Sequence, residues 1–125
     1  MFTPDSKYED IIEEKIFVRK GYEPLLWALV KALDQSQFEK GTERHGQGRA
    51  FKDQPILTIG RKIGPGFALG QALKKIDELP ALPTRDAQIK EAYGAIVYLC
   101  GAIMLLKEGY VCTKPVKEEV INENV

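Results

Sequence analysis

The chain has 125 residues, of which 44% are hydrophobic and 29% are charged, and equal numbers of basic and acidic side chains leave a formal net charge of zero. This length is enough for one domain whose core needs no disulfide or metal. The charge balance argues against a protein that mainly coats DNA or RNA, because such proteins are usually basic overall, although a local basic patch keeps an RNA partner open.

The sequence predicts a cytoplasmic protein without a membrane partner. Its first ten residues, MFTPDSKYED, lack the apolar run of a signal peptide, and the longest apolar run, Gly94 to Leu106, is too short to cross a bilayer. Cys100 and Cys112 do not form the pattern of a secreted disulfide framework, and a bridge between them is not required.

A first helix is predicted near the start of the chain. It begins at Ser6, which can form a capping box with Glu9, and it ends near Gly21. The alternative for its last part is a short extended piece from Ile16 to Val18.

The next two predicted helices differ in length. One begins near Pro24, which suits a first turn, and ends before Gly41; its apolar stripe consists of Leu26, Leu29, Val30 and Leu33. The other is short, with Asp53 as N-cap, Pro55 in the first turn and apolar residues at Ile56, Ile59 and Ile63. A strand at Ile56 to Ile59 is the alternative.

Two longer helices complete the pattern. One runs from Phe67 to about Leu79, with an apolar stripe of Leu69, Ala72, Leu73 and Ile76 and with Lys74, Lys75, Asp77 and Glu78 facing solvent. Thr84 caps the last helix, which runs from Arg85 to about Glu108. Its apolar positions cover more than half its circumference, which predicts a central place in the fold: Ile89, Ala92, Tyr93, Ile96, Val97, Cys100, Ile103 and Met104.

These patterns predict an all-α fold, a compact bundle of four to five helices with one long irregular, glycine-rich basic connection. We expect a single all-α domain over residues 1–112 and a loosely ordered polar tail over residues 113–125.

A glycine repeat in the last helix predicts a close approach of another backbone. Gly94-Ala95-Ile96 recurs as Gly101-Ala102-Ile103, so the two glycines share a face at a cost of about 1 kcal/mol each relative to alanine. The approaching backbone is either another helix of the same chain or the same strip of a second copy. In the second case Gly94, Tyr98 and Gly101 lie in an oligomer interface, and we expect a homo-oligomer, with a dimer as the favoured form.

No familiar catalytic motif is present, so the sequence leaves open whether the protein is an enzyme. His45 is the only histidine, and with two separated cysteines it does not make a zinc site, so we expect no metal and no cofactor. The Walker phosphate loop and the dinucleotide fingerprint are both missing.

The segment KKIDELPALPTRDAQIKEAYGAIVYLCGAIMLL, from Lys74 to Leu106, is superficially similar to the helix-turn-helix core of the all-α nucleoside triphosphate pyrophosphohydrolases of the MazG type. This resemblance implies magnesium-dependent nucleotide hydrolysis, with Asp77, Glu78 and Glu91 as the catalytic candidates. The chain departs from the family's acidic motif, because a proline follows Leu79 and Gly94 stands where the family has an aspartate. The resemblance therefore implies at most a depleted magnesium site.

Positive charge gathers in the glycine-rich connection between the predicted helices. Between Gly41 and Lys75 the chain holds seven basic and two acidic residues, although the whole chain is neutral. Arginine and lysine suit phosphate oxygens, glycine admits close backbone approach, and a helix N-terminus attracts anions. The candidate ligand-binding residues are Arg44, His45, Gly46, Gly48, Arg49, Phe51, Lys52, Arg61, Lys62, Gly64, Gly66 and Phe67.

We therefore predict a small soluble protein that binds a phosphorylated, nucleotide-like ligand through the basic stretch and the N-terminus of the helix at Phe67. The first alternative is the magnesium-dependent hydrolase, and the second is a protein-protein interaction module in which the basic stretch docks on an acidic partner. In the plainest interpretation the stretch only connects two helices, with its arginines paired to nearby carboxylates.

Overall fold

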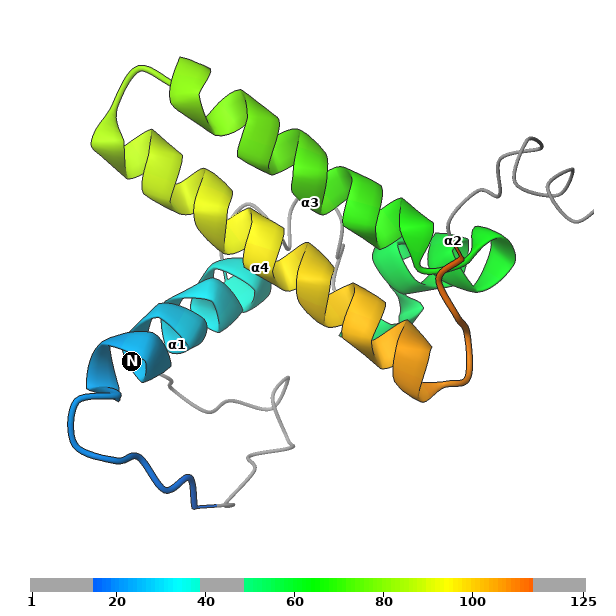
Figure 1. Ribbon diagram of the computed structural model, residues 1–125, viewed down its shortest axis with the longest axis horizontal. Coiled ribbons are helices and arrows are strands. Elements are labelled where there is room, and N and C mark those ends of the chain that lie inside the picture. The colour runs from blue at the N-terminus through cyan, green and yellow to red at the C-terminus, as the bar shows by residue number, and fades with distance from the viewer. Residues whose placement is uncertain (1–14, 39–48, 114–125) are drawn as a thin grey trace, which may run out of the picture.

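A computed structural model describes residues 15–38 and 49–113 (Figure 1). Over these residues the chain forms helices and no strand, so the predicted all-α fold is confirmed. The elements, in chain order, are α1 (Glu23–Phe38), the 3₁₀ turn η2 (Phe51–Asp53), α2 (Pro55–Ile63), α3 (Gly66–Glu78), the 3₁₀ turn η3 (Leu79–Ala81) and α4 (Arg85–Lys107).

The α3–α4 hairpin forms the centre of the fold. The two helices run antiparallel and side by side, joined through η3, and they make the most extensive contact of any two elements (Figure 1). α1 packs against α4, whereas α2 packs at the other end of the hairpin, between the start of α3 and the end of α4. α4 therefore contacts all three other helices, which confirms its predicted central place.

Local sequence sets most of the helix ends. The Thr84 hydroxyl accepts a hydrogen bond of 3.1 Å from the Ala87 N–H, which confirms the predicted cap of α4. Gly64 and Gly109 follow α2 and α4 with φ of 96° and 107°, a conformation that favours glycine. The predicted cap of α2 is displaced by one residue, because Asp53 lies in η2 and Gln54 takes the N-cap position.

The first predicted helix does not extend as far as Gly21. Residues 15–19 form no helix, and a turn at Lys20 and Gly21 leads into α1, so the helix predicted to end near Gly21 does not reach that residue. Phe17 is 97% exposed, which shows that this stretch has no apolar face to pack against within the described residues. Residues 1–14 and the tail from residue 114 lie outside the described part of the chain.

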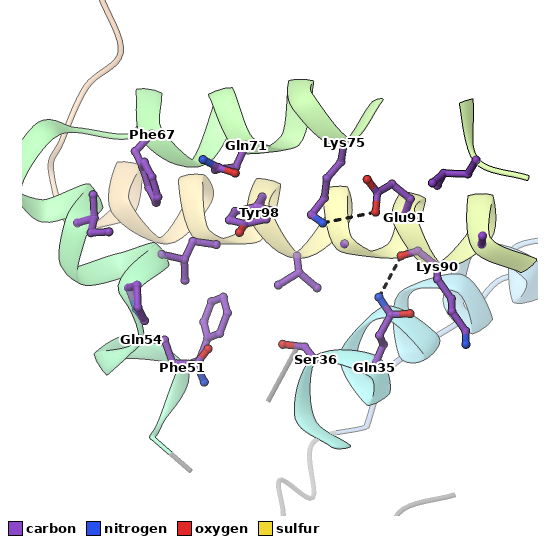
Figure 2. Close-up of a pocket in the computed structure, with 17 residues that line it drawn as sticks. Gln35, Ser36, Phe51, Gln54, Phe67, Gln71, Lys75, Lys90, Glu91 and Tyr98 are labelled. Carbon is purple, nitrogen blue, oxygen red and sulfur yellow. Dashed lines mark hydrogen bonds and ion pairs between the residues drawn. The ribbon is translucent and has the colours of Figure 1, made fainter. Parts of the chain in front are cut away.

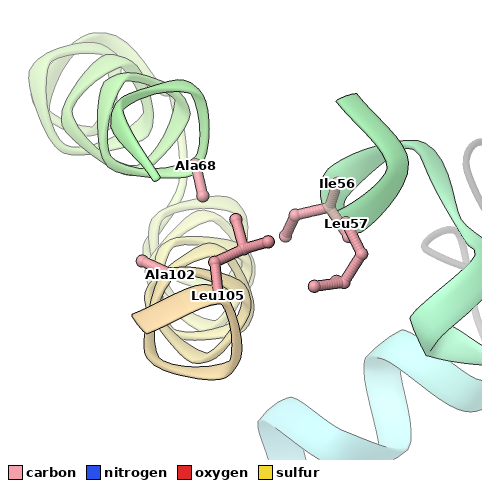
Figure 3. Close-up of a cluster of buried hydrophobic side chains, with 5 residues drawn as sticks. All are labelled: Ile56, Leu57, Ala68, Ala102 and Leu105. Atoms are coloured by element: carbon pink, nitrogen blue, oxygen red, sulfur yellow. The ribbon is translucent and has the colours of Figure 1, made fainter. Parts of the chain in front are cut away.

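The core is small and contains mainly short side chains. A cluster of Ile56, Leu57, Ala68, Ala102 and Leu105 joins α2 to both helices of the hairpin (Figure 3). Five of the eight buried hydrophobic residues in the described chain are alanine. Alanine lets α3 and α4 approach closely, but it removes little apolar surface from water.

The helical spacing predicted from the sequence is correct, but the buried face is rotated from the predicted one. Of the stripe predicted for α3, Ala72 is buried and Leu69 packs against the core, whereas Leu73 and Ile76 are 60% and 52% exposed, and the other buried residue of the helix is Ala68. In α4 the buried residues are Ala95, Gly101, Ala102 and Leu105, none of them among the apolar positions expected to form its core. Small residues therefore face inward, and several large ones face outward.

α4 is also the one helix of the described residues that is long and apolar enough to cross a membrane. Its most apolar 18-residue window has a mean hydropathy of 1.6, and 22% of that window is buried. The central helix of a soluble protein can meet the same criterion. This property alone therefore does not decide whether α4 is a membrane-spanning helix or the core helix of a soluble protein.

Candidate functional site: a cleft between four helices

A cleft of about 540 Å³ opens between the four helices (Figure 2). The end of α1 closes one side, η2 and the start of α2 another, and the α3–α4 hairpin forms the floor. This volume falls within the range of pockets that hold small molecules.

Aromatic and aliphatic side chains gather at one end of the cleft. Phe51 comes from η2, Phe67 from α3 and Tyr98 from α4, and all three rings are half-buried (Figure 2). Ile56 and Ile59 of α2 complete this wall. Burial raises the pKa of Tyr98, so its phenol stays neutral at physiological pH. This end of the cleft is suited to a flat ring system.

Charged side chains lie toward the other end. The Lys75 Nζ is 3.6 Å from Glu91 Oε1, with both side chains largely shielded from solvent at 23% and 19% exposure. The same Nζ lies 5.8 Å from the centre of the Tyr98 ring, a distance that permits a cation–π contact. Lys90 also lines this end, and Gln35 Nε2 donates a 3.0 Å hydrogen bond to its carbonyl oxygen, which ties α1 to α4. One end of the cleft is thus aromatic and apolar, and the other end is charged.

Amide side chains lie between the two ends. Gln35, Gln54 and Gln71 line the cleft from three different elements, together with the Ser36 hydroxyl (Figure 2). Gln54 Nε2 donates a 2.9 Å hydrogen bond to the Arg49 carbonyl oxygen, and this bond holds the Gln54 side chain in place. Each amide offers both donors and an acceptor, and such groups can recognise the polar edge of a heterocycle.

The two glycines of the α4 repeat serve contacts within the chain. A Cβ at Gly94 would lie 3.0 Å from Lys75 Cε, and one at Gly101 would lie 2.6 Å from Ile56 Cδ1. Gly94 thus admits the Lys75 side chain, and Gly101 admits a core side chain of α2. At both positions the close contact is with a side chain of the same chain, and Tyr98 between them lines the cleft.

Arg61 makes hydrogen bonds that connect separate elements of the fold. Its Nε and Nη2 donate to the two carboxylate oxygens of Glu108, each at 2.9 Å, and its Nη1 donates to the Lys52 carbonyl at 2.8 Å. The hydrogen bond raises the pKa of Arg61 and lowers the pKa of Glu108. This fork ties α2 and η2 to the end of α4, and Arg61 does not line the cleft.

The sequence-predicted ligand residues are therefore divided by the structure. Phe51 and Phe67 line the cleft, whereas Lys52, Arg61, Lys62, Gly64 and Gly66 do not. Four of the candidates belong to the first part of the basic stretch, residues 39–48, which lies outside the described residues: Arg44, His45, Gly46 and Gly48. Arg49 borders the cleft through its carbonyl contact with Gln54.

The acidic candidates do not form one cluster. Asp77 is exposed, Glu78 Oε1 lies 3.9 Å from Lys74 Nζ, and Glu91 pairs with Lys75. Over residues 15–38 and 49–113, no three His, Cys, Asp or Glu side chains gather closely enough to hold a metal ion.

Several residues of the cleft were missed in the sequence. Lys75 was expected to face solvent, yet it turns into the cleft, and Lys90 and the three glutamines carried no recognisable motif. The pairing of Lys75 with Gly94 depends on how α3 and α4 face each other, which no local pattern encodes. Gly60 was also missed: a Cβ there would overlap Leu105, so it sets the approach of α2 to α4.

No family model, curated protein or solved structure matches this chain. The function therefore has to be inferred from the chemistry of the cleft itself.

Proposed function

We propose that the protein binds a small, planar, phosphorylated ligand of the nucleotide type in the cleft between its four helices. The observation that carries this proposal is the polarity of the cleft, with three aromatic rings toward one end and the Lys75 ammonium group toward the other. The proposal keeps the ligand class expected from the sequence and moves the site from the basic stretch to the cleft.

The aromatic end suits the base of such a ligand. Phe51, Phe67 and Tyr98 present ring surfaces from three elements, and stacking of a base on an aromatic ring contributes about 1–3 kcal/mol. The glutamine amides nearby supply donors and acceptors for the base edge, as small-molecule sites require in addition to apolar walls.

The charged end suits a phosphate. Lys75 brings a positive charge into the cleft beside the negative charge of Glu91, and the exposed Lys90 adds a second positive charge at the rim, with its side chain directed away from Lys75 (Figure 2). Glu91 holds Lys75 in place at 3.6 Å, and its own charge disfavours a phosphate placed directly beside it. Lys75 is therefore positioned before the ligand arrives, and the phosphate approaches it from the side away from Glu91.

Isothermal titration of the protein with matched nucleosides and nucleotides at low salt tests this proposal. We expect at least one nucleotide to bind, and we expect its nucleoside to bind at least tenfold more weakly because it lacks the charge that Lys75 and Lys90 attract. Lys75→Met should remove most of this difference. Lys62→Met is the matched control, because Lys62 is exposed on α2 and does not line the cleft.

Two results would overturn the proposal. One is the absence of heat and of any chemical-shift change with every nucleotide at millimolar concentration. The other is an equal loss of affinity in the Lys75→Met and Lys62→Met proteins, which would show only a general attraction of anions to positive charge.

A further inference from the structure

One face of α3 presents three different kinds of side chain to the cleft, each four residues after the last. Phe67 lies at the aromatic end, Gln71 follows it, and Lys75 carries the ammonium group (Figure 2). Four residues advance a helix by about 6 Å and return close to the same face. The order along this wall of the cleft is therefore a ring, an amide and a positive charge.

Gln71 differs from the other two glutamines of the cleft in what its amide contacts. Gln35 Nε2 donates a hydrogen bond of 3.0 Å to the Lys90 carbonyl oxygen. Gln54 Nε2 donates one of 2.9 Å to the Arg49 carbonyl oxygen. Gln71 is half-buried, and its amide makes no hydrogen bond within the described part of the chain. Its carbonyl oxygen and both of its N–H groups thus remain available to a bound molecule.

We propose that Gln71 binds the sugar hydroxyls of the ligand, so that the cleft selects ribonucleotides over 2′-deoxyribonucleotides. This role rests on the nucleotide binding proposed above and narrows the class of ligand. In a nucleotide the sugar joins the base to the phosphate, so a base beside Phe67 and a phosphate beside Lys75 place the sugar at Gln71. The order of chemical groups in the ligand then matches the order of side chains on α3.

The charges around Lys75 direct the phosphate toward Gln71. The Lys75 Nζ lies 3.6 Å from Glu91 Oε1 and 5.8 Å from the centre of the Tyr98 ring, and these two residues are seven positions apart on α4. Because α3 and α4 are antiparallel, the Tyr98 side of Lys75 is also the side on which Gln71 lies. A phosphate repelled by Glu91 therefore lies toward Gln71, and the sugar attached to it comes within reach of the amide.

A glutamine amide is suited to two neighbouring hydroxyl groups. Each hydroxyl both donates and accepts, so the Gln71 carbonyl oxygen accepts from one while an N–H donates to the other. A 2′-deoxyribose lacks one of these hydroxyls, and one hydrogen bond is lost. A hydrogen bond of typical net strength changes affinity about fivefold. Gln71 is half-buried and water reaches its amide when the ligand leaves, so the larger ratios of fully buried sites do not apply.

The edge of the base is the other polar part of a nucleotide, and Gln54 is better placed to bind it. The Gln54 N–H donates to the Phe51 carbonyl oxygen at 3.1 Å, so both residues belong to one turn at the aromatic end of the cleft. Loss of the Gln54 side chain should weaken a nucleotide whichever sugar it carries. Gln54 and Gln71 thus have separable effects on binding.

Isothermal titration with matched pairs of nucleoside 5′-monophosphates tests the role of Gln71. The two members of a pair carry the same base, adenine, guanine or cytosine, on ribose and on 2′-deoxyribose. For the base that binds most tightly, the ribonucleotide should bind the wild-type protein about fivefold more tightly than its partner. Gln71→Leu should bring this ratio to about one by weakening the ribonucleotide alone. Leucine and glutamine have similar helix propensities, so α3 should keep its structure, which circular dichroism checks.

Gln54→Leu is the matched control, and it should weaken both members of a pair by the same factor and leave their ratio unchanged. A wild-type ratio of one, or a ratio that persists in the Gln71→Leu protein, would overturn the role of Gln71 while nucleotide binding itself stands. Failure of every nucleotide in the panel to bind the wild-type protein would overturn the proposed function together with this role.

Discussion

Lys75 of α3 crosses α4 directly over Gly94, where a Cβ would lie 3.0 Å from the Lys75 Cε. Glu91 and Tyr98, one turn to either side on α4, contact the same ammonium group. Three residues on one face of α4 thus hold Lys75 in the cleft. Glu91 pairs with its charge, Gly94 leaves room for its stem, and Tyr98 offers the face of its ring. The glycine repeat predicts a close approach of another backbone at this point, and the group that approaches is the Lys75 side chain.

Gly94→Ala should weaken ligand binding without unfolding the protein. Alanine stabilises a helix interior by about 1 kcal/mol relative to glycine, and displacement of the flexible Lys75 stem offsets this gain, so we expect a net change in unfolding free energy within about 1 kcal/mol. Nucleotide affinity should fall, because Lys75 no longer reaches its position. Urea unfolding and calorimetric titration measure the two effects separately, and an unchanged affinity would contradict the role given to Gly94.

Gly101→Ala should instead destabilise the fold. The new Cβ would lie 2.6 Å from Ile56 Cδ1, and Ile56 is only 6% exposed, so it has little room to move. Overpacking of this kind typically costs about 1–3 kcal/mol.

Adding Ile56→Val removes the atom nearest the new Cβ. A double-mutant cycle by urea unfolding should show a favourable coupling between the two substitutions. Additive effects would show that the backbone, and not Ile56, absorbs the added methyl group.

The Arg61–Glu108 fork should make stability depend on pH in the acid range. The folded-state pKa of Glu108 is lowered below its ordinary value of 4.5 by the hydrogen bond from Arg61. Its contribution is therefore fully present above 4.5 and is lost as pH falls through the folded-state pKa. Glu108→Gln should reduce the slope of unfolding free energy against pH in this range.

Glu78→Gln provides the matched control for that measurement. Glu78 is also a helix carboxylate, but it reaches Lys74 only at 3.9 Å and is half exposed. An exposed pair of this kind contributes little, so its removal should leave the acid slope nearly unchanged. Equal slopes for Glu108→Gln and the wild type would contradict the role of the fork.

Tyr98 should titrate late and weaken the fold at high pH. Burial raises its folded-state pKa above 10.0, so the unfolded chain loses this proton first. Unfolding free energy should therefore fall as pH rises from 10.0 towards the folded-state pKa. The difference in phenolate absorbance between the wild type and Tyr98→Phe gives the titration directly, and a midpoint at or below 10.0 would contradict the buried environment.

The sequence predicted the helices because their signals are local. Thr84 caps α4, Pro55 opens α2, and apolar spacing marks α3 and α4. It also predicted a close approach of another backbone at Gly94 and Gly101; the groups that approach there are side chains, Lys75 and Ile56. These inferences depend on short-range sterics and hydrogen bonds, which a single sequence contains.

The buried faces and the cleft could not be predicted in the same way. Hydrophobicity alone favours Leu73 or Ile103 over Ala68 or Ala102 as core residues, yet the close approach of α3 and α4 admits the alanines and leaves the larger side chains outside. Lys75 belongs to the cleft for the same reason, since its direction depends on the rotation of α3 against α4. Arg61 appeared basic and available in the sequence, but its Glu108 partner lies 47 residues away.

The short connection between α3 and α4 also has a consequence for how the chain folds. Contacts that close over a few residues cost little loop entropy, and proteins rich in such contacts fold fast. We therefore expect the hairpin to form early, with α1 and α2 docking later against an existing surface. Because the cleft requires all four helices, it comes into existence only at that last step, and a ligand that binds it would slow unfolding more than it would speed folding.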